Sequence, residues 1–140
     1  MFNKILLAVD GSEHGLHAAQ VAGELARAMK AESLRIVVAF DPIPPYLGEP
    51  NLQQAIEARL VNANAILEAA VGAVGKVPAK INTELIEGSP AEAIIEVAAT
   101  RSSDVIVMGS RGRGRIAGAL LGSNSQKVVS HAPCPVLIVR

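Results

Sequence analysis

The sequence predicts an α/β fold: a doubly wound, open, parallel five-stranded sheet in the order 3-2-1-4-5, with helices on both faces. Three observations predict it. The chain has 140 residues, the length of one ordinary domain, so we expect residues 1–140 to form a single domain. Short apolar runs alternate with longer stretches of helical period. Such alternation of strands and helices requires parallel strands joined by right-handed crossovers, and domains of this size and Rossmann-like type most often take the order given above.

The five strands are expected at the short apolar runs. One run, Lys80–Glu87, alternates Ile81, Thr83 and Leu85 with Asn82, Glu84 and Ile86, which predicts a half-exposed strand nearer an edge. The other four are continuous and suit strands covered by helices on both faces: 5–9, 34–40, 105–108 and Val136–Val139.

The helices are expected between these runs, four in all. The first and third have apolar residues at the spacing i, i+3, i+4, i+7, and the second, from residue 52 to about 74, has one long apolar stripe. Ser89-Pro90-Ala91-Glu92 predicts a capping box with proline in the first helical position, and Ser123-Asn124-Ser125-Gln126 has the same form at the start of the last helix. The stripe of the second helix consists of Ala55, Ile56, Leu60, Ala63, Leu67, Ala70 and Val71.

Composition excludes several classes of protein. Half of the residues are apolar, and 13 Lys and Arg balance 13 Asp and Glu, so the chain is neither a disordered tail nor a general binder of nucleic acid or membrane surfaces. Two Phe, one Tyr and no Trp argue against base stacking on aromatic platforms. The one cysteine, Cys134, cannot form an internal disulfide, and no Cys/His group has zinc-ligand spacing. Because we find neither a signal peptide nor an apolar span of about 18 residues, we expect a cytoplasmic protein.

A crevice is expected beyond the carboxyl ends of strands 1 and 4, since these neighbours lead to helices on opposite faces of the sheet. Asp10 and Met108-Gly109 lie at those two ends. A segment rich in Gly and Arg follows, and then the start of the last helix. Glycines let backbone N–H groups approach an anion, a helix N-terminus adds unpaired donors, and the hydroxyls of Ser123 and Ser125 can donate to phosphate oxygens. This segment is therefore a candidate phosphate site.

Other interpretations stay open at this stage. The segment can be a surface loop in which glycines make turns and Ser123 only caps a helix, although its position favours a ligand. Asp10 can likewise cap the first helix, because Asp10-x-x-Glu13 resembles a capping box. Three nucleotide-site or signalling classes are excluded: no Lys follows Gly122 as in a P-loop, the first strand–helix turn lacks G-x-G-x-x-G, and that turn lacks the paired acids of receiver domains.

Three blocks of the chain resemble the universal stress protein family, in its ATP-binding branch. Gly109-x-x-Gly112, nine further residues and then Gly122-Ser123 is similar to the family signature G-2x-G-9x-G-[ST]. The segments 3–12 and 131–137 resemble the opening and closing segments of the family, so that the resemblance covers the whole chain. One departure is Val38-Ala39, which stands where the family usually has a bulkier pair.

The resemblance implies a single nucleotide-binding domain that holds ATP or AMP in the crevice. It implies that Asp10 faces the adenosine, that Ala39 contacts the adenine, and that Met108 and Gly109 line the adenine and ribose. It also implies that Mg²⁺ or Mn²⁺ bridges phosphate oxygens. The residues implied to cradle the phosphates are Gly112, Gly122, Ser123, Asn124 and Ser125.

Several side chains are expected to have structural roles. We expect His14 and His17 to lie at the surface, His131 to stabilise the end of the last helix, Cys134 to be inert, and Arg111 to lie near the ligand. The last strand, Val136–Val139, is expected at a sheet edge, which a second copy would cover in a two-fold dimer, and the family resemblance implies the same.

The function expected is that of a small regulatory protein that binds an adenine nucleotide and acts in stress response through its dimer or a partner. It is not expected to be an efficient enzyme, because no carboxylate or His apart from Asp10 is placed in the crevice. Two alternatives remain: a slow ATP hydrolase or phosphotransferase, and an interaction scaffold without a ligand.

Overall fold

The computed structural model describes residues 1–111 and 121–140. It contains five parallel strands in the order β3-β2-β1-β4-β5, which confirms the predicted fold class and strand order. The strands are β1 (Lys4–Ala8), β2 (Ser33–Phe40), β3 (Lys80–Glu87), β4 (Val105–Gly109) and β5 (Val136–Val139). The helices are α1 (Glu13–Met29), α2 (Asn51–Val74), α3 (Pro90–Thr100) and α4 (Ser123–His131), with a short 3₁₀ helix, η1 (Pro45–Leu47), before α2.

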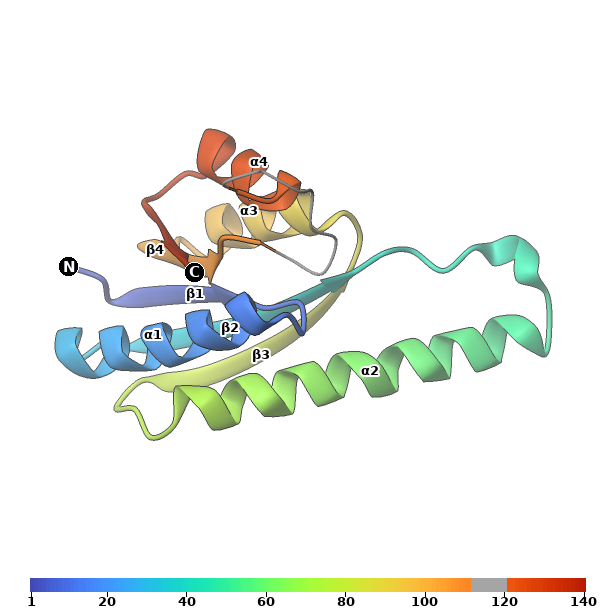
Figure 1. The fold of residues 1–140 in the computed structure, drawn as a ribbon, viewed down its shortest axis with the longest axis horizontal. Coiled ribbons are helices and arrows are strands. Elements are labelled where there is room, and N and C mark those ends of the chain that lie inside the picture. Colours follow the sequence, from blue (N-terminus) through green and yellow to red (C-terminus); the bar gives the residue numbers. More distant parts are fainter. Residues whose placement is uncertain (112–120) are drawn as a thin grey trace.

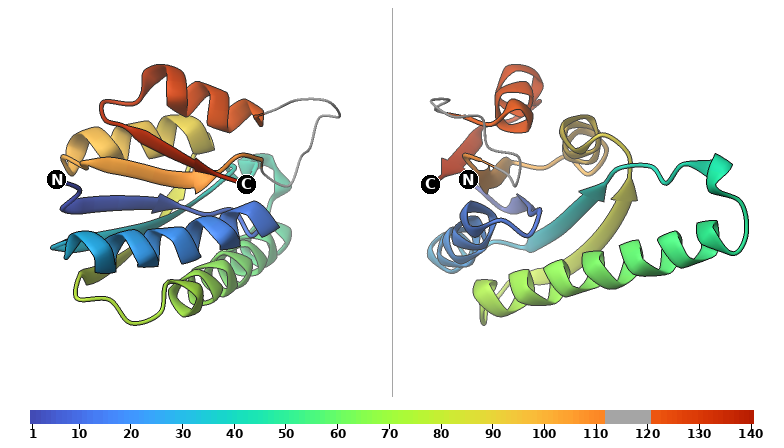
Figure 2. Two further views of the ribbon diagram at one scale, coloured as in Figure 1. Left: turned by 60° about the vertical axis from the view of Figure 1, so that its left-hand side comes forward. Right: turned by 45° about the vertical axis from the view of Figure 1, so that its right-hand side comes forward.

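The sheet separates two layers of helices. Helices α1 and α2 cover one face, and α3 and α4 cover the other (Figure 1; Figure 2). Because successive side chains of a strand point to opposite faces, Ile5 and Leu7 of β1 enter the core under α1 and α2, whereas Leu6 and Ala8 enter the core under α3 and α4. The continuous apolar runs of the central strands are explained by this double burial.

The edge strand β3 is less buried than the centre of the sheet, as its alternating sequence predicts. None of its eight residues is fully buried, and Arg35 of β2 forms an ion pair with Glu84 of β3 at 3.4 Å. The side chains of Ile81 and Leu85 nevertheless pack against the core on the side of α1 and α2.

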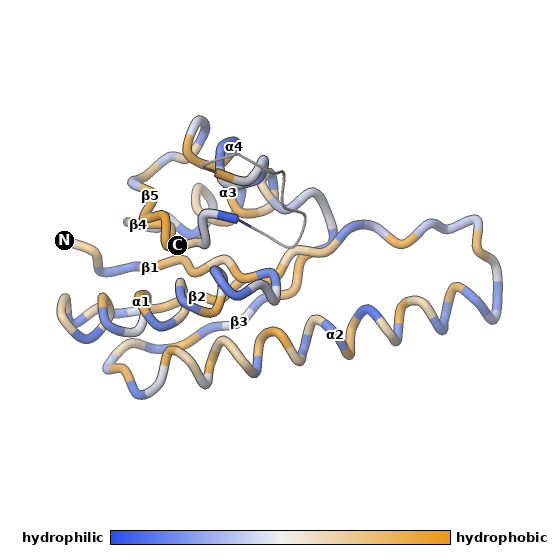
Figure 3. Tube along the Cα trace, in the orientation of Figure 1, coloured by the Kyte–Doolittle hydropathy of each residue, from blue (hydrophilic) through white to orange (hydrophobic). Residues whose placement is uncertain are grey.

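Helix α2 is longer than the surface that it covers. Its first half projects beyond the sheet, and apolar and polar residues alternate along it in Figure 3. Of the stripe expected from sequence, only Ala63, Leu67 and Ala70 are buried, whereas Leu60 is 40% exposed. The periodicity therefore predicts the helix correctly but extends the buried face too far. Among the residues described, no helix has the length and apolarity needed to cross a membrane.

Two details of the sequence interpretation are wrong at the N-termini of α3 and α4. Helix α3 begins with Pro90 after Ser89, as expected, but the Ser89 side chain makes no capping hydrogen bond, so the capping box does not form. The N-cap of α4 is Gly122, and Ser123 is already its first helical residue. Ser123 therefore does not cap this helix.

Candidate functional site

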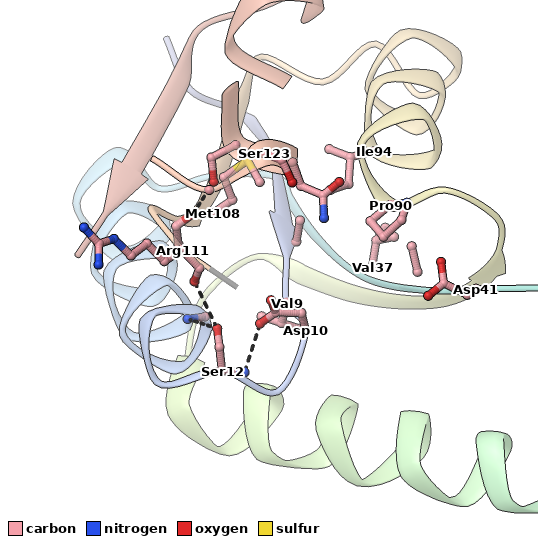
Figure 4. A pocket seen from close by; sticks show the side chains of 17 residues that line it. Val9, Asp10, Ser12, Val37, Asp41, Pro90, Ile94, Met108, Arg111 and Ser123 are labelled. Carbon is pink, nitrogen blue, oxygen red and sulfur yellow. Dashed lines mark hydrogen bonds between the residues drawn. The ribbon is translucent and has the colours of Figure 1, made fainter. Parts of the chain in front are cut away.

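A pocket of about 340 Å³ opens at the carboxyl ends of β1 and β4, where the strand order reverses. This volume lies within the range of about 300–1,000 Å³ that is usual for small-molecule sites. Figure 4 shows side chains from four parts of the chain around the pocket: the turn after β1, the end of β2, the start of α3, and the end of β4 with the start of α4. Eight of the nine residues singled out from sequence line it, namely Asp10, Ala39, Met108, Gly109, Gly122, Ser123, Asn124 and Ser125. The ninth, Gly112, lies outside the described residues.

The turn after β1 is held by short hydrogen bonds. Asp10 Oδ1 accepts a bond from the N–H of Ser12 at 2.9 Å, and Ser12 Oγ accepts one from the N–H of Gly15 at 3.1 Å. Ser12 is therefore the N-cap of α1, and the interpretation of Asp10 as the helix cap is wrong. The Asp10 side chain is exposed at the pocket, and Oδ2 has no hydrogen bond to any residue that the structure describes.

The end of β4 lies unusually close to the first turn of α1. A Cβ atom at Gly109 would come within 2.8 Å of both the main-chain carbon and the Cβ of His14. Close packing therefore gives Gly109 a structural reason to be glycine, in addition to its place in the pocket wall.

Ser110 joins three elements directly behind the pocket. Its N–H donates to the carbonyl of Val139 at 2.7 Å, and its carbonyl accepts from the N–H of Gly122 at 2.7 Å. Its hydroxyl shares a hydrogen bond of 2.8 Å with Nδ1 of His14. His14 is thus half-buried and bonded across α1 and β4, which corrects its expected role as a plain surface residue, whereas His17 is exposed and bonds the carbonyl of Arg140.

The first turn of α4 presents main-chain donors to the pocket. The N–H of Gln126 is the first in this helix with an intrahelical acceptor, the carbonyl of Gly122 at 3.0 Å. The N–H groups of Ser123, Asn124 and Ser125 precede it and have no acceptor within the helix, as is general for a first turn. Such groups, together with the helix dipole, are suited to hold an anion.

Ser123 and Ser125 differ in what their hydroxyls can do. Ser125 is buried, at 3% exposure, and its hydroxyl donates to the carbonyl of Gly109 at 2.9 Å. A hydroxyl has a single proton to donate, so Ser125 offers a ligand its N–H rather than its O–H. Ser123 and Asn124 are exposed at the pocket, where their side chains can reach a ligand.

The opposite end of the pocket is apolar, with one acid at its rim. Val37 and Ala39 of β2 face Pro90 and Ile94 of α3, and Asp41 follows them just beyond the end of β2 (Figure 4). Apart from Ala39, sequence reasoning did not assign these residues to the site. Val37 and Asp41 could have been found from the alternation of side chains along the strand, which places them on the same face as Ala39.

The remaining side chains with possible chemistry are few. Arg111 lines the pocket, on the side away from Asp41 (Figure 4). His131 ends α4 and bonds the carbonyl of Lys127 at 3.1 Å, as its expected structural role requires. Burial, with a smaller effect of Asp104, raises the pKa of the Cys134 thiol, which opposes formation of a reactive thiolate. Within residues 1–111 and 121–140, no three His, Cys, Asp or Glu side chains gather as metal ligands would.

An open parallel sheet with a polar pocket at its switch point defines a doubly wound α/β domain of the kind that binds small ligands there. More specifically, the chain belongs to the universal stress protein family, whose model matches residues 1–140. A Thermus aquaticus relative, "Universal stress protein in QAH/OAS sulfhydrylase 3'region", is 48% identical over 140 residues and the alignment covers both chains completely.

Solved structures of the family have the same fold. Universal stress protein UspA from Lactobacillus plantarum superposes with a TM-score of 0.86 at 28% identity, over 99% of this chain and 98% of that one. A universal stress protein solved in complex with cAMP has a TM-score of 0.68 at 30% identity, over 97% of this chain and 95% of that one.

Proposed function

We propose that this protein is an adenine-nucleotide-binding regulatory member of the universal stress protein family, with ATP or AMP as its ligand. The observation that carries the proposal is the convergence of Asp10, Ala39, Met108-Gly109 and the start of α4 on one pocket. These residues come from four distant parts of the sequence, and a common ligand gives one physical reason for their meeting. The cAMP complex of a relative at 30% identity supports an adenine nucleotide as that ligand.

The phosphates belong at the α4 end of the pocket. Three N–H groups without intrahelical acceptors, the exposed side chains of Ser123 and Asn124, and the partial positive charge of the helix N-terminus all favour an anion there. We assign Gly112 to the same set of phosphate-binding residues, on the basis of the family signature alone. The free oxygen of Asp10 suits a ribose hydroxyl, and the apolar walls of Val37, Ala39, Pro90 and Ile94 suit a flat base.

Mg²⁺ or Mn²⁺ would enter with the phosphates. The described part of the chain has no group of three potential ligands, whereas phosphate oxygens and water are ligands that Mg²⁺ prefers. The nucleotide would therefore hold most of the coordination sphere, and the ion would neutralise phosphate charge.

We propose binding rather than rapid turnover as the activity. Hydrolysis needs a group that orients water at the γ-phosphate, and the two described carboxylates of the pocket are Asp10, placed by this reading at the ribose, and Asp41, at the far end. Phosphate release at many turnovers per minute, abolished by Asp10→Asn, would instead favour the hydrolase.

The regulatory output is proposed to be a two-fold dimer through β5. This edge strand carries exposed apolar surface at Leu137, and an edge leaves unpaired main-chain groups that a second copy can pair. The N–H of Ser110 bonds Val139 of β5 and its carbonyl bonds Gly122, so one residue links the proposed phosphate site to the proposed dimer edge.

Thermal unfolding with excess Mg-ATP or Mg-AMP tests the nucleotide. A ligand that binds only the folded protein at about 100 times its Kd adds about 2.7 kcal/mol to the free energy of unfolding, so the midpoint should rise by several degrees. Mass spectrometry of small molecules released from freshly purified, denatured protein would identify a resident nucleotide. An unchanged midpoint and no released nucleotide would favour the ligand-free scaffold.

A further inference from the structure

Charge is distributed unequally along the pocket. The first turn of α4 supplies a partial positive charge at one end, whereas Asp41 lies at the other end (Figure 4). A carboxylate repels phosphate, because both are negatively charged. The Asp41 end is therefore the wrong place for a phosphate group and, on the proposed function, the place for the base.

The chain that leaves β2 brings Asp41 to that end of the pocket. Side chains two residues apart on an extended chain share a face, and Val37, Ala39 and Asp41 all line the pocket. Pro90 and Ile94 of α3 form the facing apolar wall. Among the residues described, none forms a hydrogen bond or ion pair with the Asp41 carboxylate, so both its oxygens can accept bonds from a ligand.

We propose that Asp41 selects the base by accepting a hydrogen bond from the 6-amino group of adenine; this inference rests on the proposed function. The 6-amino group is a donor, whereas the 6-oxo group of hypoxanthine or guanine is an acceptor at the same position. A carboxylate facing that oxygen would meet a second acceptor and lose its bond, which penalises the 6-oxo purines. Asp41 thus distinguishes 6-amino from 6-oxo purine nucleotides.

Two other uses of the carboxylate would leave different signatures. An acid in α/β nucleotide sites can bind a ribose hydroxyl, in which case it would discriminate against a 2′-deoxy nucleotide. A carboxylate can also accept from the N1–H and 2-amino groups of guanine, in which case it would favour GTP. Four ligands therefore separate the possibilities: ATP, ITP, dATP and GTP.

The experiment is equilibrium titration of these four nucleotides, with Mg²⁺, into the parent protein, Asp41→Asn and a control, Glu87→Gln. Glu87 is an exposed acid whose register partner on β2 is Phe40, next to Asp41, and it does not line the pocket. Glu87→Gln therefore removes the same charge nearby without touching the ligand. Since Asp41 is exposed, its variant should fold, which thermal unfolding checks.

The parent protein and Glu87→Gln should bind ATP about tenfold or more tightly than ITP and GTP, the scale of a hydrogen bond to a charged group. Asp41→Asn should lose most of this preference, because an amide can offer either its oxygen or its NH₂ group to the base. The ratio of ATP to dATP affinity should be the same in all three proteins.

Four results would overturn the inference. ATP binding with an undiminished preference over ITP in Asp41→Asn would remove Asp41 from base selection. A preference for GTP, or an effect of Asp41→Asn confined to dATP, would assign the carboxylate to guanine or to the ribose. If the parent protein binds none of the four nucleotides, the proposed function itself is wrong and this inference fails with it, which is distinguishable from the other outcomes.

Discussion

The hydroxyl of Ser125 donates a hydrogen bond to the main-chain carbonyl of Gly109 at 2.9 Å, and this bond joins the first turn of α4 to the end of β4. The two elements form adjacent parts of the pocket wall near the proposed phosphate site. The bond gives Ser125 a role in shaping the site that differs from the direct phosphate contact implied by the family resemblance.

Ser125→Ala should therefore lower the stability of the protein. Its effect on nucleotide affinity should be small, because the hydroxyl of Ser125 is not expected to contact the ligand. The carbonyl of Gly109 would lose its partner, at a cost of about 1–3 kcal/mol in the free energy of unfolding, whereas the main-chain N–H at position 125 would remain. Denaturant unfolding and ATP titration measure the two effects. The control is Ser123→Ala, an exposed pocket position, which should weaken ATP binding with little change in stability. The opposite pattern in these two variants would contradict the assignment.

Gly122→Val should abolish ATP binding while the fold survives. The backbone at Gly122 has φ −68° and ψ 163°, which valine adopts readily, and the N–H that bonds Ser110 is retained. The poorer helix cap should cost up to about 1 kcal/mol of stability, whereas the new side chain occupies the place proposed for a phosphate. Gly122→Ala should have a smaller effect on affinity. ATP titration and circular dichroism test this, and binding equal to that of the parent would show that the phosphate site is wrongly assigned.

Gly109→Ala should destabilise the protein even without nucleotide. Its Cβ would lie 2.8 Å from main-chain and side-chain carbons of His14, so α1 and β4 would have to separate, at a cost of about 1–3 kcal/mol. Gly72→Ala is the matched control: position 72 lies within α2 with no atom within 4 Å of the new Cβ, and alanine there should stabilise the helix by up to about 1 kcal/mol. Both are measured by denaturant unfolding. Equal stability of Gly109→Ala and the parent would show that the close approach relaxes freely.

The fold class could be predicted from the sequence because it depends on a few strong patterns, and the strand order is the one that such domains most often take. Strands buried on both faces need continuous apolar runs, such as residues 5–9, and the alternation of Lys80–Glu87 marks an edge. The starts of α2, α3 and α4 were predicted to within about one residue, whereas the capping residues of α1 and α4 were not. The S-x-x-E and S-x-x-Q patterns fit more than one register, and Gly122 caps α4 where a serine was expected.

Part of the site could be predicted from residues at strand ends, Asp10 after β1 and Met108-Gly109 at the end of β4, whereas Ala39 was assigned only through the family resemblance. The apolar end could not be predicted in the same way, because Pro90 and Ile94 reach the pocket only through the packing of α3 against the sheet. The bond of Ser110 to His14 likewise joins residues 96 positions apart. No local pattern reports such a contact.

Leu137→Lys should shift the protein from dimer to monomer if β5 forms the dimer interface. Leu137 is 39% exposed on the edge strand, and a lysine there would place a charge in an apolar, strand-paired interface. Leu60→Lys is the matched control, since Leu60 is similarly exposed, at 40%, but lies in the first half of α2, which projects beyond the sheet. Sedimentation velocity over a range of protein concentrations, with and without Mg-ATP, measures the association. Because neither leucine lies in the pocket, both variants should still bind ATP, Leu137→Lys as a monomer and Leu60→Lys as a dimer. Dimers that persist in Leu137→Lys but dissociate in Leu60→Lys would move the interface from β5 to the projecting half of α2.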